Sequence, residues 1–152
     1  MLVKYTDRSF PKKILLPTAG GEHALRAEFH ARSFMEQGGT ELEVCSVLPP
    51  NADQAAKDYS HKTINAAVTR FEKASVKGAS TKIIIHNSIV DGIIEEGKNY
   101  DAVMNGATQH PFFRKFFFGN IPERIAKYKD ISVILVKRYN PVRGAIERIL
   151  ED

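Results

Sequence analysis

The sequence predicts an α/β protein built on a doubly wound, five-stranded parallel sheet. Short apolar runs alternate with longer segments whose apolar residues recur at helical spacing. Glycine or proline stands at most of the boundaries between them. The 152 residues, 43% hydrophobic and 26% charged, suit one domain with a single core. Strands that alternate with helices favour the strand order 3-2-1-4-5, with helices on both faces.

The first half of the chain supplies two strand-helix units. Residues 12–18 form a short apolar run that ends at a Gly-Gly turn, as a buried parallel strand does. The segment "GEHALRAEFHARSFMEQGG" follows with alanines and aromatic residues at helical spacing. Residues 40–50 are the second strand, closed by two prolines. A long helix is expected over residues 54–77, with Gly78 behind it.

The second half repeats the alternation. The third strand is "STKIIIHN", and Ser88 with Asp91 fits a capping box at the start of the next helix. The remaining elements are a strand over residues 101–107, a helix over 120–129 and a strand over 131–139. Residues 1–11 are expected to be an N-terminal extension, and residues 12–138 the domain. Residues 139–152 are expected to form a helical, amphipathic C-terminal tail.

Composition excludes several classes of protein. No apolar run is long enough to span a membrane, and the first residues lack a signal sequence, so a cytoplasmic protein is expected. The single cysteine, Cys45, lies in an apolar run and is expected to be a buried thiol. The net charge of +4 is modest, and no motif for nucleic-acid binding accompanies it. Binding to a membrane surface or to an anionic ligand stays open.

The sequence contains no recognisable catalytic or metal-binding pattern. The five histidines show no ligand spacing, and one cysteine cannot complete a thiolate site, so no structural metal is expected. No lysine-bearing phosphate loop or Gly-x-Ser-x-Gly elbow occurs. Neighbouring acids such as Glu95 and Glu96 are interpreted as solvated charge. The sequence therefore predicts no enzyme, and at most slow, incidental ATP hydrolysis. An adenylating enzyme would need a basic motif that this chain lacks.

Two loops are expected to meet at the carboxyl edge of the sheet, where such folds bind ligands. They are "PTAGGEH" after the first strand and "NGATQHPFFRKFFFGNIPERIA" after the fourth. In the second loop, Gly106 permits close approach of a ligand, and the helix expected at Asn120 offers free backbone amides to a phosphate. The phenylalanines of "HPFFRKFFF" are expected to be partly core and partly available to a partner or a membrane interface.

From Lys12 to Arg138 the chain resembles a universal stress protein domain. The family pattern of a fourth strand leading into Gly-x2-Gly-x9-Gly-Ser/Thr is met by Gly106, two residues, Gln109, nine residues and Gly119-Asn120. "PTAGG" stands where the family has Pro-Thr-Asp-Gly-Ser, so Ala19 replaces a carboxylate. "FGNIPERIA" with "VILVKR" is similar to domains fused to, or acting beside, membrane transporters such as amino-acid permeases and cation antiporters.

The resemblance implies an adenine-nucleotide site for ATP or AMP, with magnesium accompanying ATP. The pattern is broken at Ala19, Gln109 and Asn120, and these differences imply weaker binding of ATP relative to AMP. The family resemblance also implies a homodimer formed through strand 131–139 and a regulatory domain that signals to a partner. The site residues carried over are Pro17, Thr18, Ala19, Val47, Asn105, Gly106, Gln109, Gly119, Asn120 and Ile121.

The residues leave two questions open, namely whether the pocket is empty and what the C-terminal tail contacts. The pocket could be filled by Gln109 and the phenylalanines, which would leave a nucleotide-independent module for dimerisation and docking. The tail, with Val142, Ile146 and Ile149 at helical spacing, could be a dimer clasp or a contact for a transporter.

Overall fold

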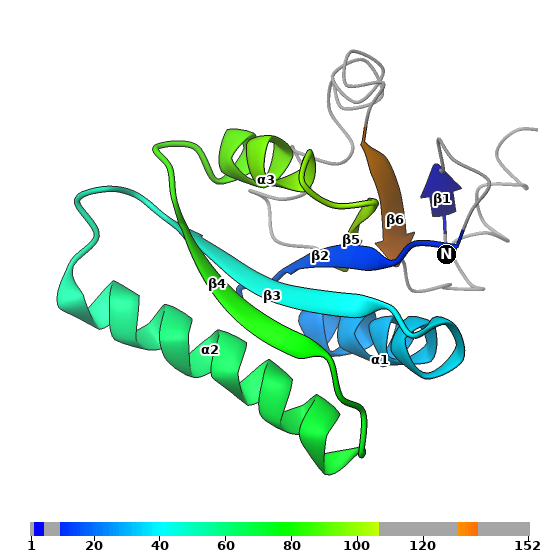
Figure 1. Ribbon diagram of the computed structural model, residues 1–152. Helices are drawn as coiled ribbons and strands as arrows, with labels where there is room; N and C mark the ends of the chain where they lie inside the picture. Colours follow the sequence, from blue (N-terminus) through cyan, green and yellow to red (C-terminus); the bar gives the residue numbers. More distant parts are fainter. Residues whose placement is uncertain (1, 5–9, 107–130, 137–152) are drawn as a thin grey trace, which may run out of the picture.

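The computed structural model describes residues 2–4, 10–106 and 131–136. These residues form a six-stranded sheet in the order β1-β6-β5-β2-β3-β4 (Figure 1). Five strands are parallel, and their order is the predicted 3-2-1-4-5. The strands are β1 (Leu2–Lys4), β2 (Lys13–Pro17), β3 (Glu41–Leu48), β4 (Ala79–Ile85), β5 (Ala102–Gly106) and β6 (Ser132–Val136).

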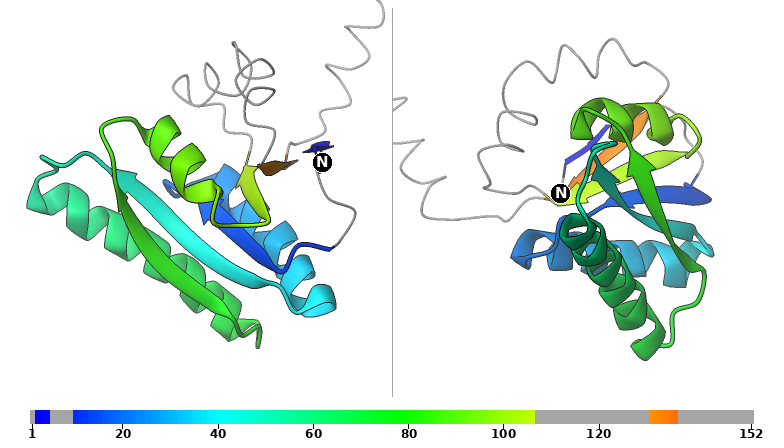
Figure 2. Two further views of the ribbon diagram at one scale, coloured as in Figure 1. Left: turned by 45° about the horizontal axis from the view of Figure 1, so that its top comes forward. Right: turned by 90° about the vertical axis from the view of Figure 1, so that its left-hand side faces the viewer.

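Helices cover both faces of the sheet, as predicted. Helices α1 (Glu22–Gly38) and α2 (Gln54–Lys73) lie on one face, and α3 (Ile89–Gly97) lies on the other (Figure 1). Both views of Figure 2 keep α3 across the sheet from α1 and α2. This division follows from right-handed crossovers, because the chain reverses its direction across the sheet after β4. Its reversal places the carboxyl ends of β2 and β5 side by side.

Each face has its own apolar core. On the first face, Ala27 and Ala31 of α1 and Ile64 of α2 are fully or almost fully buried. Small alanines allow α1 to lie close to the sheet. On the second face, Ile93 of α3 packs with Leu15, and Gly92 lies so close to His86 that an added Cβ would stand 2.9 Å from the histidine Cβ. The alternation of sides along each strand therefore serves two cores at once.

Two helix boundaries show how well capping can be predicted. The side chain of Ser88 accepts a hydrogen bond from the backbone N–H of Asp91 at 3.2 Å, which confirms Ser88 as the N-cap of α3. The N–H of Ser88 donates to Nδ1 of His86 at 2.9 Å, where the predicted capping box would have the Asp91 carboxylate. The predicted end of α2 at Lys77 was wrong, because the helix ends at Lys73. Ser75 takes a left-handed φ of 60°, and the N–H of Val76 bonds back to the Phe71 carbonyl at 3.0 Å. The early turn places the side chain of Val76 in the core, and this burial offsets the cost of the left-handed conformation at Ser75.

Polar contacts fix the positions of the elements. The carboxylate of Asp101 accepts hydrogen bonds from the backbone N–H groups of Lys12 and Lys13, at 2.8 and 2.9 Å, and so ties the start of β2 to the start of β5. Glu28 on α1, only 5% exposed, accepts two hydrogen bonds from the guanidinium of Arg70 on α2, at 2.7 and 2.8 Å. This ion pair joins the two helices of one layer, and its hydrogen bonds raise the pKa of Arg70.

The sixth strand was not predicted. Leu2–Lys4, expected to be part of an extension, pair antiparallel with β6, with Val3 opposite Ile134 (Figure 1). The helix expected over residues 120–129, the end of the strand expected to reach residue 139, and the tail over residues 139–152 lie outside the described residues.

Candidate functional site at the carboxyl edge of the sheet

The sheet brings six of the ten predicted site residues to one edge. Pro17 ends β2, and Thr18 and Ala19 follow it directly. The β2 strand pairs with β3 on one side and β5 on the other, so Val47 and the Asn105–Gly106 pair lie beside the same end. The other four residues, Gln109, Gly119, Asn120 and Ile121, lie outside the described residues.

The turn between β2 and α1 is held by backbone geometry. The N–H of Thr18 extends the ladder by donating to the Cys45 carbonyl at 2.8 Å. The Thr18 hydroxyl accepts from the N–H of Gly20 at 3.1 Å, which closes the turn locally. Gly20 and Gly21 have φ values of 81° and 86°, a region that favours glycine. Gly21 caps α1 without a side-chain hydrogen bond, so the first amides of α1 lack that partner.

Helix α2 supports this turn from outside, a feature that the sequence analysis did not identify. The hydroxyl of Tyr59 donates to the carbonyl of Ala19 at 3.3 Å. A Cβ added at Gly20 would stand 3.4 Å from the Cγ2 of Thr63. Ser60, the residue after Tyr59 on α2, hydrogen-bonds through its hydroxyl to the hydroxyl of Ser46 on β3 at 3.1 Å. Helical spacing in α2 was visible in the sequence, but nothing there indicated which polar residues would face the turn.

Asn105 is the most unusual polar group at this edge. The residue is 5% exposed, and its Nδ2 is enclosed without any hydrogen-bond acceptor. A buried donor without a partner costs about 1–3 kcal/mol, so folded proteins rarely keep one without reason. Gly106, also buried, follows it and ends β5 beside Val136 of β6. The end of β5 therefore offers a hydrogen-bond donor next to a residue that has no side chain.

The neighbouring side chains of β3 are apolar or inert. Val47 is partly buried and packs on the α3 side of the sheet, where a Cβ added at Gly92 would stand 3.1 Å from its Cγ1. Cys45 is fully buried, as predicted, and burial, with a smaller effect of Glu43, raises the pKa of its thiol far above the ordinary range. A buried thiol that stays protonated at neutral pH is a poor nucleophile.

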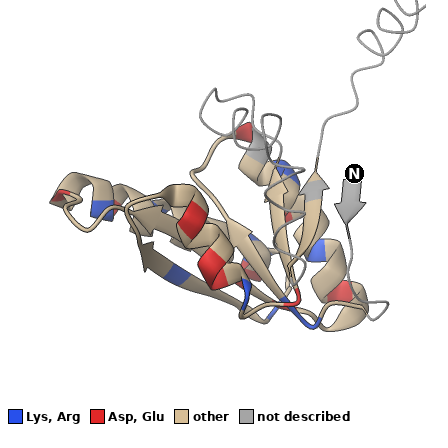
Figure 3. Cartoon of the chain, turned by 90° about the horizontal axis from the view of Figure 1, so that it is seen from above, with Lys and Arg blue, Asp and Glu red and all other residues tan. Residues whose placement is uncertain are grey.

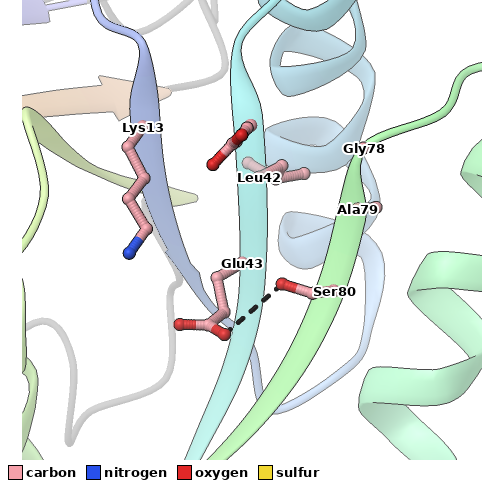
Figure 4. Close-up of a pocket in the computed structure, with 7 residues that line it drawn as sticks. Lys13, Leu42, Glu43, Gly78, Ala79 and Ser80 are labelled. Atoms are coloured by element: carbon pink, nitrogen blue, oxygen red, sulfur yellow. Dashed lines mark hydrogen bonds between the residues drawn. The ribbon is translucent and has the colours of Figure 1, made fainter.

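A hollow of about 280 Å³ lies at the opposite end of the strands (Figure 4). Its walls include Lys13, Glu43 and Ser80, near the starts of β2, β3 and β4. The hydroxyl of Ser80 donates to Glu43 at 3.3 Å, and Tyr100 donates to the other oxygen of the same carboxylate. These partners satisfy Glu43 within the fold. Because the hollow lies at the starts of the strands, it is distinct from the carboxyl edge that carries the predicted residues.

Charge does not single out either end of the sheet. Acidic and basic residues are interspersed over the described elements (Figure 3). On the α3 face, Lys82 donates to Glu96 at 2.7 Å, and this hydrogen bond raises the pKa of Lys82. Among residues 2–4, 10–106 and 131–136, no group of three or more histidine, cysteine or acidic residues could hold a metal ion. No helix in this part of the chain has the length and apolar character needed to cross a membrane.

Comparison with known proteins decides the family. The model of the universal stress protein family matches residues 11–137. The chain belongs to the universal stress protein family. The family resemblance drawn from Gly106, Gln109 and Gly119 is thereby confirmed. No curated protein matches the sequence.

Solved universal stress proteins share the fold. A universal stress protein from Archaeoglobus fulgidus matches with a TM-score of 0.65 at 18% identity, covering 82% of this chain and 93% of the other. A structure of the universal stress protein from Archaeoglobus fulgidus in complex with dAMP has a TM-score of 0.65 at 16% identity, covering 85% and 100%. A universal stress protein in complex with cAMP has a TM-score of 0.63 at 17% identity, covering 84% and 98%.

Proposed function

We propose that this universal stress protein domain binds an adenine nucleotide, ATP or AMP, at the carboxyl edge of β2, β3 and β5. Adenine and ribose would lie against Pro17, Thr18 and Val47, with Ala19, Asn105 and Gly106 beside them. The phosphates would lie toward Gln109, Gly119, Asn120 and Ile121. The domain would act by binding and not by catalysis.

The observation that carries this proposal is the enclosed Nδ2 of Asn105, which has no acceptor. It lies at the end of β5, beside the turn after β2, at the edge where doubly wound sheets bind ligands. A nucleotide supplies acceptors in its base, ribose and phosphates. Entry of such a ligand would open the enclosure around Asn105 and give the amide its missing partner. Gly106, with no side chain, leaves room for close approach.

Ligands of the solved relatives support the same chemical class. One relative was crystallised with dAMP and another with cAMP, both of which are adenine nucleotides with a single phosphate. In this chain Ala19 takes the place of the family aspartate, so the turn after β2 brings no carboxylate for magnesium. We therefore expect a single-phosphate nucleotide to bind relatively better here than ATP with magnesium.

Calorimetric titration with ATP, ADP and AMP, each with and without magnesium, tests the proposal. Two variants locate the site. Thr18→Val removes the acceptor that closes the turn after β2 and should weaken binding several-fold. Ser80→Ala removes a hydroxyl at the opposite hollow and should leave binding unchanged. No binding of any nucleotide at millimolar concentration would contradict the proposal, and loss of binding only in Ser80→Ala would place the ligand in the hollow.

We further propose that this domain is cytoplasmic and passes the nucleotide state to a partner. Similarity of "FGNIPERIA" and "VILVKR" to transporter-linked domains makes a membrane transporter, such as an amino-acid permease or cation antiporter, the partner to test first. Two copies would associate through the strand expected over residues 131–139, whose described part is the apolar β6. Sedimentation velocity over a concentration series tests self-association separately from nucleotide binding.

A further inference from the structure

The outer edge of β6 is the surface that the proposed dimer would use, and it is already occupied. Leu2, Val3 and Lys4 stand opposite Leu135, Ile134 and Val133 in antiparallel register. A second copy related by a two-fold axis would also bring its β6 antiparallel to this edge. Because both strands would use the same backbone N–H and C=O groups, one molecule cannot pair with both.

We propose that β1 guards the β6 edge, so that the chain pairs with a second copy only when Leu2–Lys4 leave it. This inference rests on the proposed dimer. In a pairing centred on Ile134, the partner would present Val, Ile and Leu where β1 presents Leu, Val and Lys. At the first two of these positions β1 and the partner strand both present apolar residues, and at the third β1 presents lysine in place of leucine. Short edge strands that carry lysine are a common defence against edge-to-edge association.

The length of β1 suits a removable guard. It pairs over three residues, whereas two copies of β6 could pair over all five residues of Ser132–Val136. If an open edge is needed on both copies, the apparent dimer dissociation constant rises with the inverse square of the open fraction. An edge open in about one molecule in ten would weaken dimerisation by about a hundredfold. Small changes in β1 should therefore change self-association strongly.

The first test uses two full-length variants at one position. Val3→Pro removes a backbone donor and forces a φ that the strand disfavours, whereas Val3→Thr keeps both the donor and the β propensity. Sedimentation velocity should give a dimer dissociation constant at least about tenfold lower for Val3→Pro than for the wild type, with Val3→Thr unchanged. Equal constants in all three proteins would overturn the guard while leaving a dimer, and Val3→Pro that stays monomeric would overturn both guard and dimer.

A reversible lock provides a second test that does not rely on a disrupted strand. Lys4 and Val133 are direct cross-strand partners, and such pairs have Cα separations that suit a disulfide. The variant Lys4→Cys with Val133→Cys should be monomeric when oxidised and should regain wild-type association when reduced. Buried Cys45 does not compete for the new thiols. Dimerisation of the oxidised, fully locked protein would overturn the inference. Nucleotide titration of the same variants tests the ligand site independently.

Discussion

Replacing Asn105 by leucine separates a ligand-binding amide from a structural one. Leucine has nearly the same size and carries no polar atom, so it removes the Nδ2 that lacks an acceptor at a site only 5% exposed. An unsatisfied buried donor costs about 1–3 kcal/mol. Asn105→Leu should therefore unfold at the same or higher denaturant concentration, with a free energy of unfolding raised by up to about 2 kcal/mol. If the amide donates to a bound nucleotide, the same change should weaken binding by about 5- to 150-fold.

Urea unfolding without ligand and calorimetric titration with AMP measure the two quantities on one preparation. Asn65→Leu is the matched control, because Asn65 is exposed on α2 and the chemical change is identical. It should leave nucleotide affinity unchanged. The opposite outcome is an Asn105→Leu protein that loses more than about 1 kcal/mol of stability and keeps its affinity for AMP. That outcome would show that the amide serves the fold and not the ligand.

Four further substitutions test the turn after β2, the ion pair between α1 and α2, and the buried thiol. Ala19→Asp restores the family carboxylate and should raise affinity for ATP with magnesium relative to AMP, measured by calorimetry. Tyr59→Phe removes the 3.3 Å bond to the turn and should cost less than about 1 kcal/mol of stability in urea while weakening nucleotide binding a few-fold. Arg70→Met leaves the Glu28 carboxylate without its partner and should lower the free energy of unfolding by about 1–3 kcal/mol. This loss is smaller than that for breaking a fully buried ion pair, because water reaches Arg70. Adding Glu28→Leu should recover most of the loss. Burial raises the pKa of Cys45, so above pH 9 the unfolded thiol ionises while the folded thiol stays protonated. The free energy of unfolding of the wild type should therefore fall with rising pH, by up to about 1.4 kcal/mol per pH unit more than that of Cys45→Ala. Urea unfolding of both proteins at pH 8 to 11 measures this difference.

The parallel sheet was predictable because its signals are local. Each strand is a short apolar run with a breaker behind it, and each helix shows its period over several turns. The end of α2 was not predictable in the same way. Glycine is the usual residue at a left-handed turn, yet Ser75 takes that conformation and Gly78 comes later with a φ of 98°. The helix ends before the predicted Lys77 because Val76 packs into the core, which is a tertiary effect.

Long-range pairing accounts for what the sequence analysis missed. Leu2–Lys4 are only three residues, too few to show a strand period, and their partner lies at the far end of the chain. Tyr59 likewise reaches Ala19 across 40 residues. By contrast, the gathering of Thr18, Val47 and Asn105 followed from strand order alone, since the ends of neighbouring parallel strands share one edge. Which atoms at that edge lack partners could be seen only with the side chains in place.

The strand that carries Asn105 and the strand edge that β1 covers are neighbours in one sheet. Asn105 on β5 is paired with Leu135 on β6, and Leu135 is paired with Leu2 on β1. Exchange of β1 for a second copy would therefore act on the strand bonded directly to the one that carries Asn105. If pairing of β6 with another copy changes nucleotide affinity by some factor, linkage requires that the nucleotide change dimerisation by the same factor. Under the two proposals together, the domain would report a bound nucleotide through its state of association. Equal nucleotide affinity in the locked monomer and the freed dimer would instead mean that the two edges act independently.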